Sequence, residues 1–362
     1  MPLSQFDPDR YTDLLTEKVD RYRADFADLG LPVPAVFASA PAAYRLRAEF
    51  RMWHVGDRVH YAMFDPANPR SPVLIEHFPP AAAPIARVMG RLREALDGAD
   101  LLRRRLFQVE FLATLSGELL VSLVYHRRLD AAWTEAARAL AADLGVLLIG
   151  RSRGQKIVLE RDWVLERFDL DGRALQYRQV EGSFTQPNGE VNRHMLHWAR
   201  AQVAEVGGDL LELYCGNGNF TVALAPHFER VLATEMSKTS VRTAHWNLEA
   251  NGVGNVTMVR MASEEISDAL AGGRDYRRLR EVDLAAHRFT TLFVDPPRAG
   301  LDAATVALAA RFDRVLYISC NPQTLHRDVV ALSASHRIET AAAFDQFPYT
   351  PHLECGVCLV KR

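Results

Sequence analysis

The most constraining feature of the sequence is a regular alternation of short apolar runs and helical patterns between residues 209 and 360. Such alternation is typical of βαβ units that build a parallel sheet. The expected strands cover residues 210–214, 230–234, 256–259, 291–294 and 315–318. Two further strands, near residues 338–344 and 355–360, leave almost no room for a helix between them, so we expect them to pair antiparallel.

The first half of the chain has a different pattern. Two hairpins are expected, one joining residues 50–54 to 59–64 and one joining residues 107–115 to 118–125. Helical patterns cover roughly residues 10–28, 83–98 and 131–144. These features predict an α+β module on an antiparallel sheet, with a domain boundary near residue 180, so that the two domains are residues 1–180 and 181–362.

Composition indicates an ordinary globular protein of the cytoplasm. The chain has 362 residues and a formal net charge of −2, no apolar run long enough to span a bilayer, and no signal-peptide pattern at its start. Its four cysteines do not form a disulfide framework, and the C-x-x-C at Cys355 and Cys358 is interpreted as part of a terminal strand. Arginine clusters in the first half suggest contact with RNA, although each alone is typical of a solvated face.

A glycine-rich turn follows the first strand of the second half. The sequence runs from Glu212 through Tyr214, Gly216 and Gly218 to Phe220, and glycine permits close approach of the backbone to a ligand. Glu235 ends the next strand, where a carboxylate can accept hydrogen bonds from both hydroxyls of a ribose. Together the two features resemble the class I methyltransferases that use S-adenosylmethionine; the alternative is a ligand-free turn with a capping glutamate.

The fourth expected strand ends in Asp295-Pro296-Pro297-Arg298. The two prolines restrict the backbone, so Asp295 is expected at a fixed place on the carboxyl edge of the sheet, where open α/β sheets bind ligands. Methyltransferases that act on exocyclic nitrogens carry a similar motif followed by an aromatic residue. Arg298 stands in that place here, which argues against nitrogen methylation.

Cys320 follows the fifth strand, directly before Asn321-Pro322 and an expected helix. A helix N-terminus favours thiolate over thiol, so we expect an activated nucleophile, with a buried structural cysteine as the alternative. A thiolate that adds to C6 of uracil turns C5 into a carbon nucleophile, and a base must later remove the C5 proton. Glu354 is the candidate base; it could instead be a solvated loop acid, and His352 is a weaker competitor.

These motifs together resemble the RNA uracil-5-methyltransferases, in particular the bacterial members that act on tRNA. The similar segments are residues 44–51, 214–220, 295–298, 319–322, 344–350 and 354–355. The resemblance implies a class I (Rossmann-like) catalytic domain, an N-terminal RNA-recognition domain, and methylation of the T-loop uridine U54 of tRNA to ribothymidine. It also implies Cys320 as nucleophile and Glu354 as proton acceptor. The positions that match the S-adenosylmethionine site are Gln186, Tyr214, Asn219, Glu235 and Asp295.

The RNA contacts are expected in the first half of the chain. Candidates for base stacking are Phe50, Trp53, Phe107 and Tyr125, and Arg51 and Phe107 are the residues we select. We expect a monomer without metal or iron–sulfur cluster, acting on the tRNA T-arm and on any other RNA with a similar stem-loop. The alternatives are a ribosomal-RNA uracil-5-methyltransferase and a non-catalytic factor that remodels tRNA.

Overall fold

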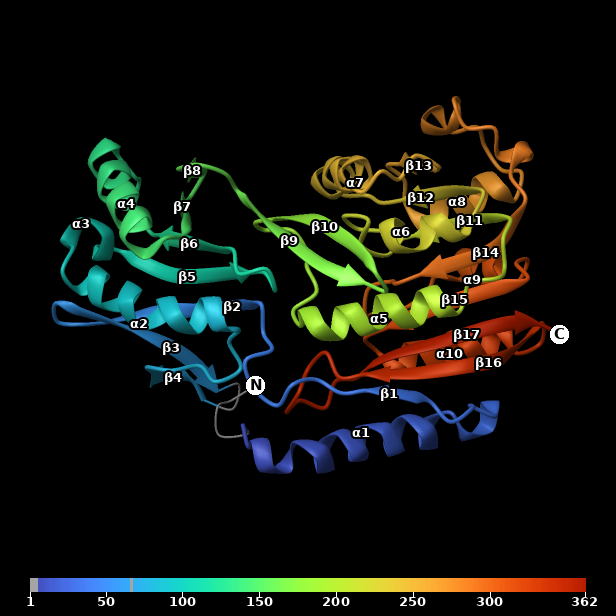
Figure 1. Ribbon diagram of the computed structural model, residues 1–362, viewed down its shortest axis with the longest axis horizontal. Coiled ribbons are helices and arrows are strands. Elements are labelled where there is room, and N and C mark those ends of the chain that lie inside the picture. The colour runs from blue at the N-terminus through green and yellow to red at the C-terminus, as the bar shows by residue number, and fades with distance from the viewer. Residues whose placement is uncertain (1–5, 66–67) are drawn as a thin grey trace. The chain divides into compact units, whose positions relative to one another are not determined.

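The computed structural model describes residues 6–65 and 68–362, whose contacts divide the chain into two compact units (Figure 1). Unit 1 contains Ala40–Phe168 and Arg178–Glu190. Unit 2 contains Arg10–Ser39, Asp169–Tyr177 and Val191–Arg362. The chain therefore passes between the units several times.

This division differs from the predicted single boundary near residue 180. The first helix, α1 (Tyr11–Asp25), belongs to unit 2, where Tyr22 and the following Phe26 are buried in the same apolar core as the strands. The helical pattern identified α1 correctly, but an apolar stripe does not reveal which core it packs against.

Unit 2 is built on an eight-stranded sheet with the order β1-β16-β17-β15-β14-β11-β12-β13. The predicted parallel strands are confirmed, and β17 runs antiparallel to β16, as the short connection indicated. It also pairs antiparallel with β15, which the sequence did not predict. The short strand β1 adds a parallel edge beside β16. The bounds are β1 (Ala35–Phe37), β11 (Asp209–Leu213), β12 (Arg230–Thr234), β13 (Val256–Val259), β14 (Phe289–Val294), β15 (Arg314–Ser319), β16 (His336–Phe344) and β17 (Glu354–Lys361).

Helices cover both faces of this sheet, which explains why its central strands are mostly apolar. One core contains residues of α1, α8, α9 and α10 together with β11, β14, β15 and β17. On the opposite face Phe220 of α6 packs on Phe293, with ring centroids 4.7 Å apart. The bounds are α5 (Gly189–Ala201), α6 (Asn219–Leu224), α7 (Lys238–Ala250), α8 (Ser263–Leu270), α9 (Ala303–Ala309) and α10 (Pro322–Leu332).

Unit 1 is built on a seven-stranded sheet with the order β4-β3-β2-β5-β6-β7-β8. Both predicted hairpins are present, and the sheet is antiparallel except where α4 connects β6 to a parallel β7, because a parallel pair needs a crossover. The bounds are β2 (Arg47–Val55), β3 (Arg58–Asp65), β4 (Asn68–Ile75), β5 (Leu106–Ala113), β6 (Leu119–Tyr125), β7 (Leu147–Ser152), β8 (Gln155–Val158), α2 (Ala83–Asp97), α3 (Asp100–Arg103) and α4 (Ala131–Leu144).

A separate two-stranded ribbon, β9 (Trp163–Leu170) and β10 (Arg173–Val180), contributes its turn to unit 2. The turn is held there by Asn251, whose Oδ1 accepts from the Gln176 amide at 3.0 Å and whose Nδ2 donates to the Gln176 carbonyl at 2.7 Å. Across residues 6–65 and 68–362, no helix has both the length and the apolar character needed to cross a membrane.

Candidate active site

The antiparallel pairing of β15 with β17 brings Cys320 and Glu354 together. The last paired residues are Ser319 and Cys355, so the next step of the same register sets Cys320 opposite Glu354. Residues opposite each other on neighbouring strands have Cβ atoms about 5 Å apart and project from the same face of the sheet. The two predicted catalytic residues, 34 positions apart in the sequence, are thus neighbours at one edge of the sheet.

Glu354 is a buried acid, which excludes the alternative of a solvated loop residue. Its exposed fraction is 5%. Burial raises the pKa of Glu354 well above its usual value, and the nearby Asp295 carboxylate raises it further. A carboxylate with a raised pKa is a stronger base than a solvated one, which suits the removal of a proton from carbon.

Cys320 is half-buried, and its ionisation differs from the expectation of a thiolate. Burial raises the pKa of Cys320 to about 11, Glu354 and Asp295 act in the same direction, and only Arg298 opposes them appreciably. The start of α10 does not overcome this effect, because Cys320 precedes the N-cap and Asn321 itself accepts a hydrogen bond from the Gln323 amide at 3.2 Å. The free protein therefore holds a thiol at neutral pH.

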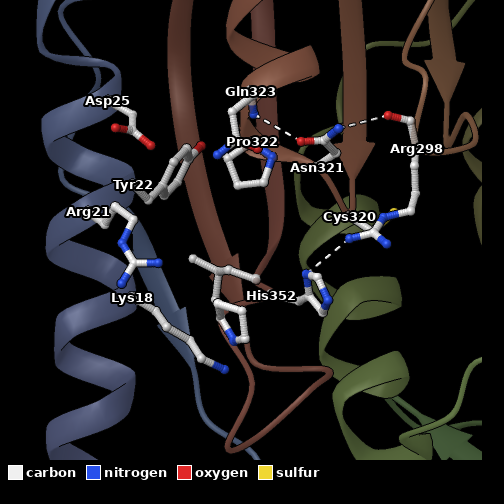
Figure 2. A pocket seen from close by; sticks show the side chains of 12 residues that line it. Lys18, Arg21, Tyr22, Asp25, Arg298, Cys320, Asn321, Pro322, Gln323 and His352 are labelled. Carbon is white, nitrogen blue, oxygen red and sulfur yellow. Dashed lines mark hydrogen bonds between the residues drawn. The ribbon is translucent and has the colours of Figure 1, made fainter. Parts of the chain in front are cut away.

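Arg298 is held beside Cys320 by two neighbours. Its guanidinium donates to Nδ1 of His352 at 3.0 Å, and its carbonyl accepts from Nδ2 of Asn321 at 2.8 Å (Figure 2). Burial and the nearby Arg298 and Lys18 lower the pKa of His352, so the ring is neutral and its Nδ1 can accept. This arrangement makes His352 a positioning residue for Arg298 rather than a competitor for the base.

The glycine-rich turn after β11 adopts left-handed backbone conformations at Tyr214, Gly216 and Gly218, with φ of 60°, 58° and 80°. Its backbone is tied to Glu235, whose carboxylate accepts from the Gly216 amide at 3.1 Å and from the Ser237 amide at 2.6 Å. Glu235 is half-buried and so remains accessible at the end of β12. The turn and the acid are thus joined by hydrogen bonds, and their contact with the cofactor stays a prediction.

Tyr214 and Asn219 are fixed on either side of this turn. The Tyr214 hydroxyl donates to Oγ of Ser263 at 2.6 Å. Asn219, the first residue of α6, exchanges two amide hydrogen bonds with Asn192, at 2.8 and 3.0 Å. Because each side chain has a partner, both are held in place before any ligand arrives.

Two further acids lie at the same edge of the sheet. Glu212 on β11 is fully buried, and neither of its carboxyl oxygens has a hydrogen-bond partner among the described residues. Burial raises the pKa of Glu212 to about 8 and the pKa of Asp295 to about 7. Burial of an acid without a hydrogen-bond partner is costly in its charged form, which is why the protonated form of Glu212 is favoured. Its signal in the sequence was an acid inside an apolar strand, to which we had assigned no role.

Gln186 is the predicted cofactor residue that lies outside unit 2. It belongs to the Arg178–Glu190 segment of unit 1, between β10 and α5. Its contact with the cofactor stays a prediction.

Arg51 and Phe107 form a stack in unit 1. The Arg51 guanidinium carbon lies 3.5 Å from the centre of the Phe107 ring, which stacks on His126 with ring centroids 4.0 Å apart. Arg51 is exposed and Phe107 is half-buried. Of the other stacking candidates, Trp53 is exposed, whereas Phe50 and Tyr125 are each only 2% exposed and belong to the core.

A cavity of about 250 Å³ opens beside Cys320 in unit 2 (Figure 2). One wall is α1, and the opposite wall is formed by Arg298, the turn after Cys320 and the loop before Glu354. The lining residues are Lys18, Arg21, Tyr22, Asp25, Arg298, Cys320, Asn321, Pro322, Gln323, Pro351, His352 and Leu353. The contribution of α1 was missed from the sequence, which had placed this helix in the other domain.

The remaining cysteines are structural residues of the protein interior. Cys215, Cys355 and Cys358 are buried, and the last two are strand residues of β17, as interpreted from the sequence. Within the described part of the chain, no group of three or more histidine, cysteine, aspartate or glutamate side chains could hold a metal ion.

The sheet order, the glycine turn and the acid after β12 are those of a Rossmann-like methyltransferase. The family model of tRNA (uracil-5-)-methyltransferases matches residues 10–362. The chain belongs to this family, and it is accordingly a methyltransferase enzyme. The predicted cofactor, S-adenosylmethionine, is confirmed at the level of the family.

Individual proteins agree with this assignment. The chain is 70% identical over 361 residues to a tRNA/tmRNA (uracil-C(5))-methyltransferase of Azoarcus sp. (strain BH72), covering 100% of this chain and 99% of the relative. A protein of the same name from Dechloromonas aromatica (strain RCB) is 62% identical, with full coverage of both chains. The fold resembles that of the Pyrococcus abyssi tRNA (uracil-54, C5)-methyltransferase in complex with S-adenosyl-L-homocysteine, with a TM-score of 0.73, 22% identity, and coverage of 97% of this chain and 83% of that chain.

Proposed function

We propose that the protein methylates C5 of the T-loop uridine U54 in tRNA, using S-adenosylmethionine and a covalent bond between Cys320 and C6 of the uracil. The observation that carries the proposal is the register that sets Cys320 opposite Glu354. Cys320 lines a cavity whose two walls both belong to unit 2, and Glu354 directly follows Leu353, another residue that lines it. Such proximity suits a sulfur nucleophile and a base for the carbon-bound proton.

The substrate follows from the relatives and from the exposed groups of the chain. The bacterial relatives are named for tRNA and tmRNA, and the archaeal structure is named for uracil-54. We therefore propose the tRNA T-arm as the main substrate, and tmRNA or another RNA with a T-loop-like stem-loop as a second one. The Arg51–Phe107–His126 stack offers a cation and an aromatic surface for an unstacked base and its phosphate.

The reaction begins when Sγ of Cys320 loses its proton to water and bonds to C6 of the extruded uracil. The electron pair of the C5–C6 double bond moves toward C5 and O4, and C5 becomes a nucleophile. S-adenosylmethionine, when bound, supplies a methyl group on a positively charged sulfur. After C5 is methylated, Glu354 takes the C5 proton, the bond between Sγ and C6 breaks, and the C5–C6 double bond is restored.

The residues around the glycine turn fit this cofactor. Glu235 presents a carboxylate at the end of β12, where it can accept from ribose hydroxyls. Glu212 and Asp295 are acids that a positively charged group would stabilise. Tyr214, Asn219 and Gln186 complete the proposed set, Gln186 by resemblance alone.

The same comparisons bear on the alternatives. A ribosomal-RNA specificity would conflict with the names of the bacterial relatives. A non-catalytic tRNA-remodelling factor would have no use for a half-buried Cys320 beside the buried Glu354. We further propose that the enzyme works in the cytoplasm as a monomer.

The test is to map 5-methyluridine in unmodified RNA transcripts after incubation with the enzyme and S-adenosylmethionine. We expect methylation of tRNA at U54 alone, and none in a matched transcript with cytidine at that position. Methylation of tmRNA at one stem-loop uridine would agree with the proposal. Methylation of ribosomal RNA in preference to tRNA, or at a tRNA site other than U54, would contradict it.

A further inference from the structure

Four side chains of α1 face the cavity beside Cys320. Lys18, Arg21, Tyr22 and Asp25 have the spacing i, i+3, i+4 and i+7, which places them on one face of the helix (Figure 2). Two of them, Lys18 and Tyr22, are buried, whereas Arg21 and Asp25 are exposed. Lys18 and Tyr22 therefore anchor the helix, whereas Arg21 and Asp25 are accessible to a ligand.

The buried side chains hold α1 firmly in unit 2. Nζ of Lys18 donates to the Asp345 carboxylate at 2.7 Å and to the Phe347 carbonyl at 2.9 Å. Both partners lie in the loop between β16 and β17, which carries His352 and leads to Glu354. Tyr22 packs edge to face on Phe26, at 4.9 Å between ring centroids. Because α1 is fixed to the same loop as the proposed base, Arg21 has a defined place relative to Cys320.

Arg21 is the exposed cation of this wall. Within the described residues it forms no hydrogen bond or ion pair, not even with Asp25 at the i+4 position, where oppositely charged side chains commonly pair. The charge of Lys18 is already matched by Asp345, and Arg298 on the opposite wall is engaged by His352. A guanidinium with five free donors is well suited to a phosphate, which it can bind through two parallel hydrogen bonds.

We infer that Arg21 binds an RNA backbone phosphate adjacent to the target uridine while the uracil lies against Cys320. The inference rests on the proposed function, because the phosphate is near Arg21 only if the target nucleotide enters this cavity. A nucleotide extruded from its stack carries a phosphate on each side, and contacts to these phosphates fix its position without reading the base. The helix α1 is then part of the RNA-binding surface although it belongs to the catalytic unit.

The first experiment compares Arg21→Gln with Arg23→Gln. Arg23 is also exposed on α1, but it does not line the cavity. A guanidinium nitrogen of Arg23 lies 3.9 Å from a carboxylate oxygen of Asp20. Binding of an unmodified tRNA transcript is measured at several salt concentrations, each variant being made in a Cys320→Ala protein so that no turnover occurs. Arg21→Gln should weaken binding by about tenfold and reduce the salt slope by about one. Arg23→Gln should stay within about twofold of its parent, and Arg21→Lys should recover most of the loss.

The second experiment locates the phosphate. A synthetic T-arm stem-loop carries one uncharged methylphosphonate, placed either 5′ or 3′ of the target uridine. At one of these positions the substitution should weaken binding to the parent protein about tenfold and to Arg21→Gln hardly further, because both changes remove the same contact. Equal binding losses for Arg21→Gln and Arg23→Gln, or additive losses at both phosphates, would overturn the inference.

The wild-type enzyme, assayed in parallel for 5-methyluridine in the same tRNA, separates the two proposals. If it methylates U54 while Arg21 shows no effect on binding, only the inference fails. If it methylates no uridine at C5, the proposed function fails, and the inference that rests on it is overturned as well.

Discussion

The glycine turn after β11 and the cavity beside α1 open at the same edge of the unit 2 sheet but differ in the ionisable groups around them. The turn is surrounded by acids: Glu212, Glu235 and Asp295. The cavity presents the exposed cations Arg21 and Arg298 beside one exposed acid, Asp25. In the proposed function each substrate carries a charge opposite to that of its region. The cofactor brings a positively charged sulfur to the acids, and the RNA brings phosphates to the cations.

Charged groups of both regions affect the pKa of Cys320. Burial raises this pKa most, Glu354 and Asp295 raise it further, and Arg298 lowers it, so these acids help to keep the thiol protonated in the free protein. A cation bound near Asp295 would reduce the effect of that acid and so favour the thiolate. The contrast between the two regions thus suggests that the nucleophile becomes more reactive when the cofactor site is filled.

The largest effect on the rate of methylation is expected from a substitution of Glu354, where the two regions meet. Glu354→Gln should lower the rate of methylation by about 10²–10⁴-fold, because the amide cannot accept the C5 proton. It should also accumulate a covalent complex with ordinary uridine RNA, since the methylated adduct cannot resolve. Denaturing gels and initial rates measure both effects.

The matched control is Glu339→Gln, which changes an acid on the neighbouring strand β16 that pairs with Arg314 at 2.8 Å. This variant should methylate at close to the normal rate. A Glu354→Gln enzyme that turns over normally would show that another group removes the proton.

The next effect separates the acidic region from the basic one. Glu235→Gln should weaken binding of S-adenosyl-L-homocysteine by about ten- to a hundredfold, because a charged acceptor of ribose hydroxyls is lost, and should leave tRNA binding unchanged. Calorimetry with each ligand measures both affinities. Glu229 precedes β12 whereas Glu235 follows it, so Glu229→Gln is the control. If Glu235→Gln impaired tRNA binding instead, the division of the site into two regions would be wrong.

The smallest effect concerns stability and pH. Burial raises the pKa of Glu212 to about 8, above its value in an unfolded chain, so the folded protein binds this proton more tightly. As the pH rises from about 4 to 8, the unfolded chain ionises Glu212 before the folded protein does, and the free energy of unfolding falls. Relative to Glu212→Gln, the wild type should lose on the order of a few kcal/mol over this window. Denaturant unfolding at several pH values tests this, and parallel pH curves for the two proteins would contradict it.

Much of the second half could be predicted from the sequence because its signals are local. The strands that became β11 to β15 were recognisable as buried apolar runs, and the missing helix between the last two strands correctly predicted that β17 runs antiparallel. That reversal sets Glu354 opposite Cys320 because β17 also pairs with β15, which the sequence did not predict.

Other features depend on contacts between distant segments and could not be predicted in this way. The stripe of α1 predicts a helix, but the pairing of Lys18 with Asp345, 327 residues away, decides which unit holds it. The start of α10 suggested a thiolate at Cys320, whereas burial, together with two carboxyl groups from other strands, raises its pKa and keeps it a thiol. In the sequence Arg21 cannot be distinguished from any other solvated arginine, because the cavity beside it is formed by segments that are far apart in the chain.

The account's central claim is the temporary bond between Cys320 and the uracil ring, and RNA with 5-fluorouridine at the target position tests it most directly. Fluorine replaces the proton that Glu354 would remove, so the enzyme and S-adenosylmethionine should form a complex that survives a denaturing gel. Digestion and mass spectrometry should place the RNA on Cys320, and Cys320→Ala should form no complex although it still binds tRNA. A complex attached to another residue, an undiminished complex in Cys320→Ala, or no complex with an active enzyme would contradict the claim.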